Sequence, residues 1–349
     1  MLTKIKKNES FSKAMLSKGA STPCDEDSNF VMELPEWADE NKIKIAQRFF
    51  ILNLNAMVHA LAIGLGAVAA VPSILEVLNF TKKSSTPALA YRRYKANAIH
   101  SQIWYKYPIK PGTKAWKSLE TVRKMHVVIN RRSLNSGSGI ISQKDMSITL
   151  YLFMGFHLLM PERFGIVGSR EQFEAFNHFW RLIGYMLGIK DEFNCCEESL
   201  EGTRNRLEAI REDLLLPSLQ FPSTGYESYT KTAIEGMWYF NPLDNNYEAM
   251  MFTMKRVMQV PGYFYFWSEN DGEVEKNQKI FDSMSILQHI RIFLDIIIYE
   301  YLSKVFVFRW IFNLIRMSFG ILDVYPILAL RRFGKKFAYV KVLDSKQNK

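Results

Sequence analysis

The chain has 349 residues, 48% of them hydrophobic and 14% aromatic, so it can bury a large core and is not compositionally disordered. Its formal net charge is +10, with basic residues concentrated near both ends. No nucleic-acid-binding motif accompanies this charge, so we expect no nucleic-acid partner. The three cysteines form neither a disulfide framework nor a zinc motif, and no apolar signal core precedes residue 40. These features predict an intracellular protein that is not secreted.

Residues 1–35 are polar and predict a flexible N-terminal tail. The first helix is expected at Glu40–Phe50, followed by an apolar helix that continues to about Phe80 and is kinked at Pro72. Between Phe49 and Leu75 the sequence has no Asp, Glu, Lys or Arg, which is long enough to span a bilayer. Asparagine, histidine and glycine residues interrupt this run. A buried helix that lines a pocket and a membrane span both stay open here.

The stretch GLGAVA at Gly64–Ala69 matches the pattern G-x-G-x-x-A. That pattern indicates a dinucleotide site only where it follows a strand and begins a helix. Here it lies inside an apolar helix, which favours close helix packing through small residues.

Helical patterns continue along the chain, and they are separated by turn-rich segments such as YPIKPG and SLNSGSG. Ser142 and Ser169 each precede a polar first turn and are expected helix starts. The expected helices occupy residues 88–106, 119–132, 142–159, 169–189 and 198–215.

No alternating strand pattern and no internal repeat is present, so the fold class is predicted to be all-α. One helical domain is expected over residues 36–340, with a short C-terminal tail at 341–349. The apolar segment at residues 293–315 carries Asp295, Glu300, Lys304 and Arg309 around the helix. Charges at mid-membrane are costly, so a core helix or a membrane-surface helix fits this segment better than a span.

One histidine lies in the apolar stripe of an expected helix. Val122, Met125, His126 and Ile129 recur at spacings typical of one helix face, so His126 is expected to point inward. A core histidine satisfied by one hydrogen bond is the ordinary interpretation. A ligand to a metal or haem iron is the alternative.

Three charged side chains near apolar helices complete a candidate set. Glu76 follows the long apolar run, and Arg92 and Lys95 share a helix face at i, i+3. Together with His126 they could line one apolar pocket. Taken singly, each charged side chain is typical of a solvated helix end or face.

Four motifs in order resemble the catalytic domain of the rubber oxygenases (latex clearing proteins), which is shared with the ER-bound oxygenases of the mpaB type. The resemblance extends from about Val71 to Phe193 and more weakly to about Phe333. The motifs are VPSILEVLNFTKKSSTPALAYRRYKANA, GTKAWKSLETVRKMHVVINRR, SQKDMSITLYLF and FWRLIGYMLGIKDEF.

The resemblance implies an all-α fold that holds haem b, with His126 as the ligand to the iron. It implies catalytic roles for Glu76 as a base and for Arg92 and Lys95 as distal basic residues, with Arg92 also contacting the cofactor. Rubber oxygenases have threonine directly after that lysine, whereas this chain has Ala96, so oxygen handling or substrate choice is expected to differ.

The resemblance also implies dioxygen and a hydrophobic, unsaturated substrate, isoprenoid-like or lipid. A haem-dependent oxygenase is therefore the leading interpretation, attached to a membrane such as the endoplasmic reticulum. A haem- or lipid-binding protein without turnover is the alternative. An integral membrane protein anchored by residues 49–75 is the third.

Overall fold

The computed structural model describes residues 11–25, 30–243, 246–263 and 281–343, and within them it contains helices and no strand. The elements of the first half are η1 (Met15–Gly19), α2 (Glu40–Leu52), α3 (Leu54–Ala69), α4 (Pro72–Phe80), α5 (Pro87–Lys106), α6 (Lys114–Asn135), α7 (Gln143–Leu159), α8 (Pro161–Phe164) and α9 (Arg170–Met186). Those of the second half are α10 (Leu200–Ile210), η2 (Arg211–Leu215), α11 (Leu216–Gln220), α12 (Tyr226–Trp238), α13 (Tyr247–Val257), α15 (Ile286–Asp295), η3 (Ile296–Tyr301), η4 (Leu302–Lys304), α16 (Phe306–Ser318), α17 (Ile321–Val324), α18 (Ile327–Phe333) and α19 (Lys335–Ala338). The predicted all-α class and the single helical domain are confirmed.

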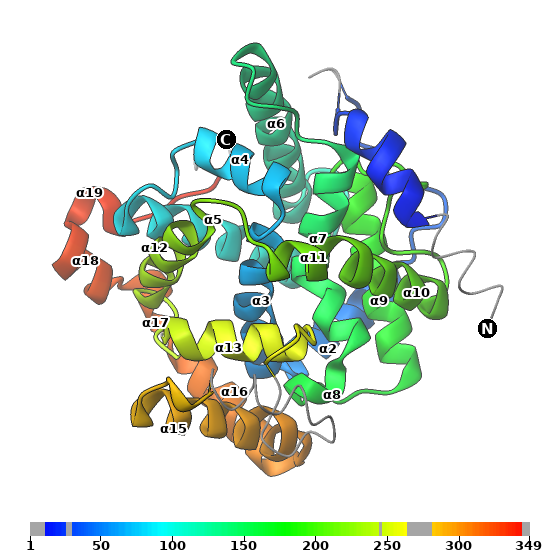
Figure 1. Cartoon of the computed structure of the whole chain (residues 1–349). Coiled ribbons are helices and arrows are strands. Elements are labelled where there is room, and N and C mark those ends of the chain that lie inside the picture. Colours follow the sequence, from blue (N-terminus) through cyan, green and yellow to red (C-terminus); the bar gives the residue numbers. More distant parts are fainter. Residues whose placement is uncertain (1–10, 26–29, 244–245, 264–280, 344–349) are drawn as a thin grey trace.

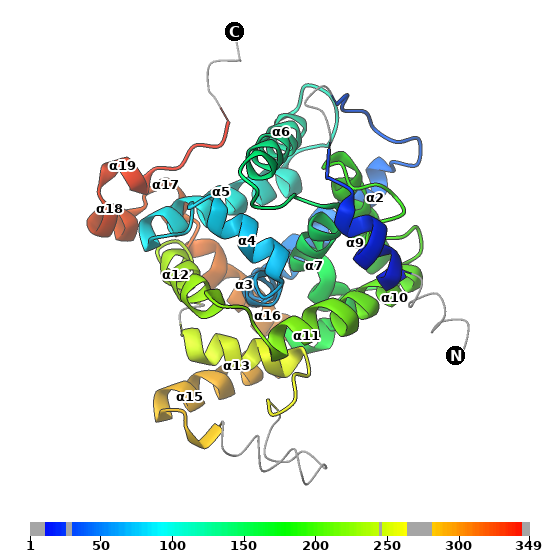
Figure 2. The same ribbon diagram turned by 45° about the horizontal axis from the view of Figure 1, so that its top comes forward.

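Helix α3 lies at the centre of the molecule, and the other helices surround it (Figures 1 and 2). It packs against α7, α13 and α16, while α2 packs against α9 and α5 packs between α6 and α12. Most residues of α3 are buried, which its composition of Ala, Gly, Val, Ile and Leu allows on all sides. The charge-free run is thus explained by burial within the protein.

The separate helix expected at Glu40–Phe50 is present as α2, but the apolar helix expected to continue to Phe80 with a kink at Pro72 is interrupted before Pro72 and forms two helices, α3 and α4. Asn53 separates α2 from α3, and the two axes are bent by 89°. The buried Asn53 amide bonds the backbone of Val167 in both directions: its Nδ2 donates to the carbonyl oxygen at 3.0 Å, and its Oδ1 accepts from the amide nitrogen at 3.0 Å. Pro72 begins α4, where a missing N–H costs nothing.

Within the described residues no single helix has both the length and the apolarity to cross a membrane. Two bent pairs satisfy those criteria only when they are taken together, α2 with α3 and Ile286–Lys304 with Phe306–Val324. The second pair is bent by 120°.

The flexible tail expected over residues 1–35 does not hold for residues 11–25. Met15 is fully buried, and Gly19 lies against the ring of Phe193, where a Cβ would come within 3.2 Å. Asp25 pairs with Arg123 of α6 at 2.8 Å. Residues 1–10 and 26–29, and the tip of the expected C-terminal tail at 344–349, lie outside the described residues.

Both predicted serine helix starts are confirmed. Ser142 and Ser169 form capping boxes with Asp145 and Gln172, in which each side chain bonds the other residue's backbone N–H. The predicted packing role of the GLGAVA glycines is also visible. A Cβ at Gly64 would lie 3.1 Å from the carbonyl oxygen of Leu152, so the absence of a side chain lets α3 approach the backbone of α7.

His157 bridges these same two helices. Its Nε2 donates to the carbonyl oxygen of Met57 at 3.0 Å, and burial lowers its pKa to about 4 from an ordinary value near 6.5. Because the folded state binds this proton less tightly, the unfolded state binds more protons between these two values. Stability contributed by neutral His157 is therefore present above about pH 6.5 and is lost as the pH falls toward 4.

We predict that the free energy of unfolding falls as the pH is lowered from about 6.5 to about 4, by at most about 1.4 kcal/mol per pH unit for this group. His157→Gln keeps a donor toward Met57 and does not titrate. The free energy of unfolding of this variant should therefore fall less than that of the wild type between about pH 6.5 and 4. Urea denaturation at several pH values measures both slopes. Equal slopes would mean that His157 does not contribute.

Candidate active site

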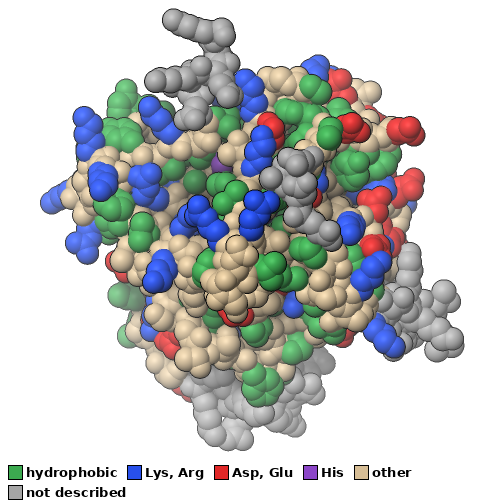
Figure 3. Space-filling view, turned by 90° about the horizontal axis from the view of Figure 1, so that it is seen from above, with side chains coloured by type: hydrophobic (Ala, Val, Ile, Leu, Met, Phe, Trp, Pro, Cys, Tyr) green, Lys and Arg blue, Asp and Glu red, His purple; other side chains and the backbone are tan. Residues whose placement is uncertain are grey.

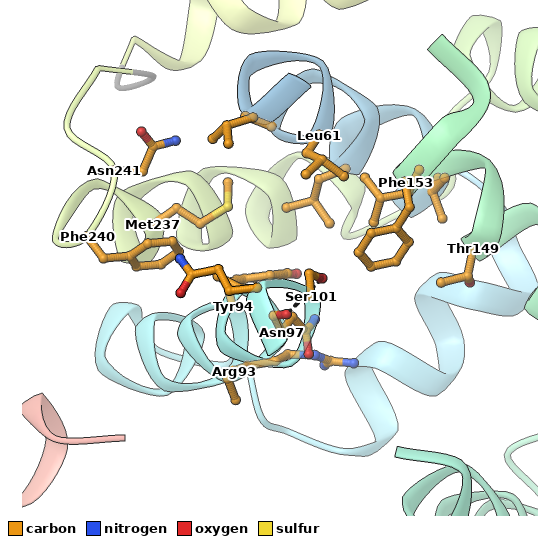
Figure 4. A pocket seen from close by; sticks show the side chains of 18 of the residues that line it. Leu61, Arg93, Tyr94, Asn97, Ser101, Thr149, Phe153, Met237, Phe240 and Asn241 are labelled. Atoms are coloured by element: carbon orange, nitrogen blue, oxygen red, sulfur yellow. Dashed lines mark hydrogen bonds between the residues drawn. The ribbon is translucent and has the colours of Figure 1, made fainter. Parts of the chain in front are cut away.

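A mainly apolar cavity of about 510 Å³ lies beside α3. It is enclosed by α3, α4, α5, α6, α7 and α12 and by the α16–α17 segment. Figure 4 shows Tyr94, Asn97 and Ser101 of α5 opposite Leu61 of α3, with Phe153 of α7 and Met237 of α12 on the flanks. Further apolar lining comes from Leu54, Val58, Leu65, Val77, Met125, Ile129, Leu152, Phe240, Met317 and Phe319.

His126 lies in the lining of this cavity, with Met125 and Ile129 of the predicted stripe. Its Nδ1 is buried and has no hydrogen-bond partner. The other five histidines are all described, and none of them lines the cavity. Each has a partner: Ser118 for His100, Met57 for His157, Asp39 for His178, Phe281 for His289 and the stacked ring of Tyr299 for His59. His126 is therefore set apart by its position in the cavity lining. His157 also has a buried Nδ1 without a partner, but its Nε2 bonds Met57.

Burial, together with the nearby Arg93 and His100, lowers the pKa of His126 to about 4. The imidazole is therefore neutral at neutral pH, which is the form that binds a metal ion. Within the described residues no group of three or more His, Cys, Asp or Glu side chains could hold a metal ion. A haem iron needs only one protein ligand, and the neutral, unpaired imidazole in an apolar cavity fits that requirement.

Arg93, next to the predicted Arg92, lines the cavity, as does Arg316, which is bonded to Asn55 and Asn241. The Arg93 guanidinium donates only weakly, to Thr81 Oγ1 at 3.3 Å and Ser84 Oγ at 3.5 Å, and pairs with no carboxylate of the described residues. Arg92 points away and donates to the carbonyl oxygen of Lys336 at 2.6 Å. The structure thus does not bring Arg92 together with His126.

Lys83 also lines the cavity near Arg93. Partial burial lowers its pKa, and the like charges of Arg93 and Arg132 lower it further. Lys83 and Arg93 are thus cations held close together near the imidazole without a neutralising carboxylate in the described part of the chain. Such an arrangement is suited to an anionic group.

Lys95 is buried and forms an ion pair with Asp323 of α17. The ammonium does not line the cavity, whereas Asp323 does. Gln102 also donates to Asp323, at 3.2 Å. Lys95 therefore contacts the site through Asp323.

Glu76 is exposed and lies outside the cavity lining. Its carboxylate lies near Gly139, in the loop after α6, where a Cβ would be 3.9 Å from Oε2. The expectation that Glu76 lines the apolar pocket with His126 is wrong for this structure, because its position on α4 turns it to the surface.

The cavity face of α5 starts one residue later than the sequence predicted. Arg93, Asn97 and Ser101 recur at i, i+4, i+8, and Tyr94 and Ala96 lie beside them. This spacing was readable in the sequence, but the choice between adjacent arginines needed the phase of the helix. Tyr94, a site residue that the sequence analysis missed, shares a hydrogen bond with Tyr229 of α12.

Polar residues of α7 support the wall that faces α5. Asp145 lines the cavity and accepts from Ser73 at 2.6 Å, and Thr149 also lines it. Gln143 is fully buried and bonds the backbone of Cys24, Gly188 and Lys190, each at 3.0 Å. The polar residues of the QKDMSIT segment thus hold the N-terminal end of α7 in place.

The comparisons agree with this picture. The family model for the catalytic domain of ER-bound oxygenase mpaB/B′ and rubber oxygenase matches residues 48–259, and the chain belongs to this family. No curated protein matches the sequence significantly. A solved structure of latex clearing protein in its closed state is similar, with 14% identity, a TM-score of 0.53, and coverage of 90% of this chain and 89% of that one. This likeness establishes a shared fold.

The ion pair at the cavity edge leads to an asymmetric prediction. Asp323→Ala leaves the Lys95 ammonium, 4% exposed, buried without its counter-ion and should lower the free energy of unfolding by about 3 kcal/mol. Lys95→Met leaves a carboxylate that is 29% exposed and still bonded to Gln102, so its cost should be clearly smaller. Chemical denaturation of both variants checks the order. If both variants lost the same free energy of unfolding, the burial of Lys95 would not be what makes the loss of its partner costly.

Proposed function

We propose that the protein is a haem b-dependent oxygenase that acts on a hydrophobic, unsaturated substrate, isoprenoid-like or lipid, with His126 as the iron ligand. One observation carries the proposal: His126 is the histidine that lines the apolar cavity, and its buried Nδ1 has no hydrogen-bond partner. A core histidine satisfied by a hydrogen bond, the ordinary interpretation, does not describe this residue. Membership of the oxygenase family supports the reaction class.

Haem b carries two carboxylates on an otherwise apolar ring, and the lining offers matching groups. Lys83 and Arg93 would pair with the carboxylates, since neither has a carboxylate partner among the described residues. Ile129, Leu152 and Phe153 would contact the apolar ring. We therefore assign the cofactor contact expected of Arg92 to its neighbour Arg93.

When bound, the haem iron would supply the binding and activation of dioxygen for oxidation of a C=C bond. The residues of this chain would supply the rest. Leu54, Val58 and Leu61 form a wall without charge along α3, which excludes water and accommodates a hydrocarbon chain.

The remaining predicted residues take indirect roles in this proposal. Lys95 positions Asp323 at the cavity edge, and Asp323 is the carboxylate available there to move a proton. Glu76 and Arg92 lie outside the lining and have no assigned step. Ala96 lines the cavity without a hydroxyl, which distinguishes the site from rubber oxygenases that carry threonine after the lysine.

The first test concerns the iron ligand. His126→Gln should abolish or shift the Soret band of the purified protein and lower its haem content at least tenfold. His100→Gln is the matched control, because His100 is a buried histidine close by that bonds Ser118 and does not line the cavity. Absorption spectra, haem quantification and circular dichroism give the readouts. A folded wild-type chain reconstituted with haem that shows no Soret band would overturn the proposal.

The second test uses the two adjacent arginines. Arg93→Met should reduce haem retention or oxygen consumption with a polyprenyl substrate at least tenfold, because it removes one of the two cations in the cavity that have no carboxylate partner among the described residues. Arg92→Met removes a cation bonded only to the Lys336 carbonyl and should change either quantity less than twofold. A larger effect from Arg92 would reverse the assignment. Haem binding without any oxygen consumption would identify the non-catalytic haem-binding protein.

A further inference from the structure

The polarity of helix α16 is inverted relative to that of an ordinary surface helix. Its inward side carries Arg309, Asn313 and Arg316, spaced by four and three residues. Asn313 Nδ2 donates to the carbonyl oxygen of Leu52 at 2.9 Å, and Arg316 Nε donates to Asn55 Oδ1 at 3.0 Å. The polar side of α16 is therefore bonded to the junction of α2 and α3.

The outward side of α16 is apolar and aromatic. Phe306 is 68% exposed and Trp310 is 57% exposed. Other exposed side chains of this segment are Val305, Val307, Phe308, Ile311, Leu314, Ile315, Met317 and Ile321. A surface helix in water normally turns its apolar stripe inward. Because α16 turns its apolar side outward and its polar side inward, we infer that its outer side contacts something other than water.

The preceding segment, α15 with η3, presents a second apolar stripe. Leu287, Ile290, Leu294, Ile297 and Tyr301 are all exposed and recur at alternating spacings of three and four residues. The opposite side of this segment packs on α13 through Ile292.

Together the outward residues of α15, η3, α16 and α17 form what we call the apolar face, defined by the exposed side chains named above and Val324. Helices α15 and α16 lie along the lower edge of Figure 1, on the side opposite α6, and α17 lies farther up on the left. On the face seen in Figure 3, by contrast, apolar side chains are scattered among charged and polar ones. Large contiguous apolar patches on a folded protein mark an interaction site.

Charge identifies the occupant. Over residues 302–343 the only acidic residue is Asp323, which is bound to Lys95. Besides the inward Arg309 and Arg316, the same stretch carries Lys304, Arg331, Arg332, Lys335, Lys336 and Lys341. A second copy of the same face would bring like charges together, whereas the anionic surface of a lipid bilayer would attract them.

We propose that the apolar face inserts into one leaflet of a lipid bilayer, with Phe306 and Trp310 at the level of the headgroups. The helices lie in the plane of the membrane and do not cross it, because their inner sides pack on α13 and α3 and the pair is bent by 120°. Arginine and lysine side chains on the flanks bind the anionic headgroups, and the aromatic rings occupy the interface.

The face and the cavity meet at the α16–α17 segment. Met317 lines the cavity and is also strongly exposed, and Phe319 and Gly320 line it beside Met317. A hydrophobic molecule dissolved in the leaflet could therefore reach the cavity without passing through water. Attachment itself requires neither haem nor turnover, so its failure and the failure of the proposed oxygenase activity are distinguishable.

The test is co-sedimentation of the full chain with vesicles of phosphatidylcholine, with and without phosphatidylserine. The wild type should bind both, and phosphatidylserine should raise the bound fraction at low salt. The double variant Phe306→Glu, Trp310→Glu should bind at least tenfold more weakly. Phe221→Glu is the matched control, because Phe221 is an aromatic residue that is 82% exposed but lies after α11, away from the face.

Two further measurements keep the outcome decisive. Brominated lipids should quench tryptophan fluorescence of the wild type, and Trp310→Phe, which preserves folding and hydrophobicity, should lose most of that quenching. Analytical ultracentrifugation without vesicles should show a monomer or non-specific association. A defined dimer that the double variant dissociates, together with no vesicle binding by the wild type, would overturn the proposal in favour of a second copy. A monomer that binds no vesicle would also overturn it.

Discussion

The charge-free central helix is the constraint on which the rest of the structure depends. Helix α3 is buried on nearly all sides, so other helices must cover it, and α7, α13 and α16 do so. Gly64 lets α7 approach to backbone contact on one side. The cavity lies where α5 and α6 do not close fully against α3. Its apolar character is therefore a property of the helix that organises the core.

Within this frame the sequence predicted class and periodicity well. The all-α fold, the serine caps and the position of His126 on the cavity side followed from local pattern and from the family motifs. Local pattern placed the end of α2 and the break at Pro72 to within a few residues, but it could not give the sharp bend of 89° between α2 and α3. Asn53 ends α2 because its amide bonds the backbone of Val167, a residue 114 positions away, and no window of sequence contains that partner.

The arginine assignment failed for a related reason. Arg92 and Arg93 are adjacent, and a helix turns by about 100° per residue, so a shift of one position decides which side chain faces a cavity. Two long-range hydrogen bonds set the rotation of α5 about its axis. Arg92 donates to the carbonyl oxygen of the distant Lys336, and Tyr94 shares a hydrogen bond with Tyr229 of α12. Glu76 is a similar case, since it is two residues from buried Ile74, and a rotation of about 200° places its carboxylate on the opposite, exposed side of α4.

The C-terminal helices show how sequence and structure together say more than either alone. In the sequence, scattered charges within residues 293–315 argued against a membrane span. In the structure three of these four charges fall on the inner side: Asp295 is buried and bound to Arg291, Glu300 pairs with Arg256 of α13, and Arg309 donates to backbone carbonyl oxygens. Lys304 is exposed. The inner charges are thus satisfied within the protein, and the exposed side is mainly apolar. Contact with a lipid bilayer would remove these apolar side chains from water, and the free energy of their exposure would be recovered. The segment that reads as a poor transmembrane helix is therefore well suited to lie in a leaflet beside the cavity.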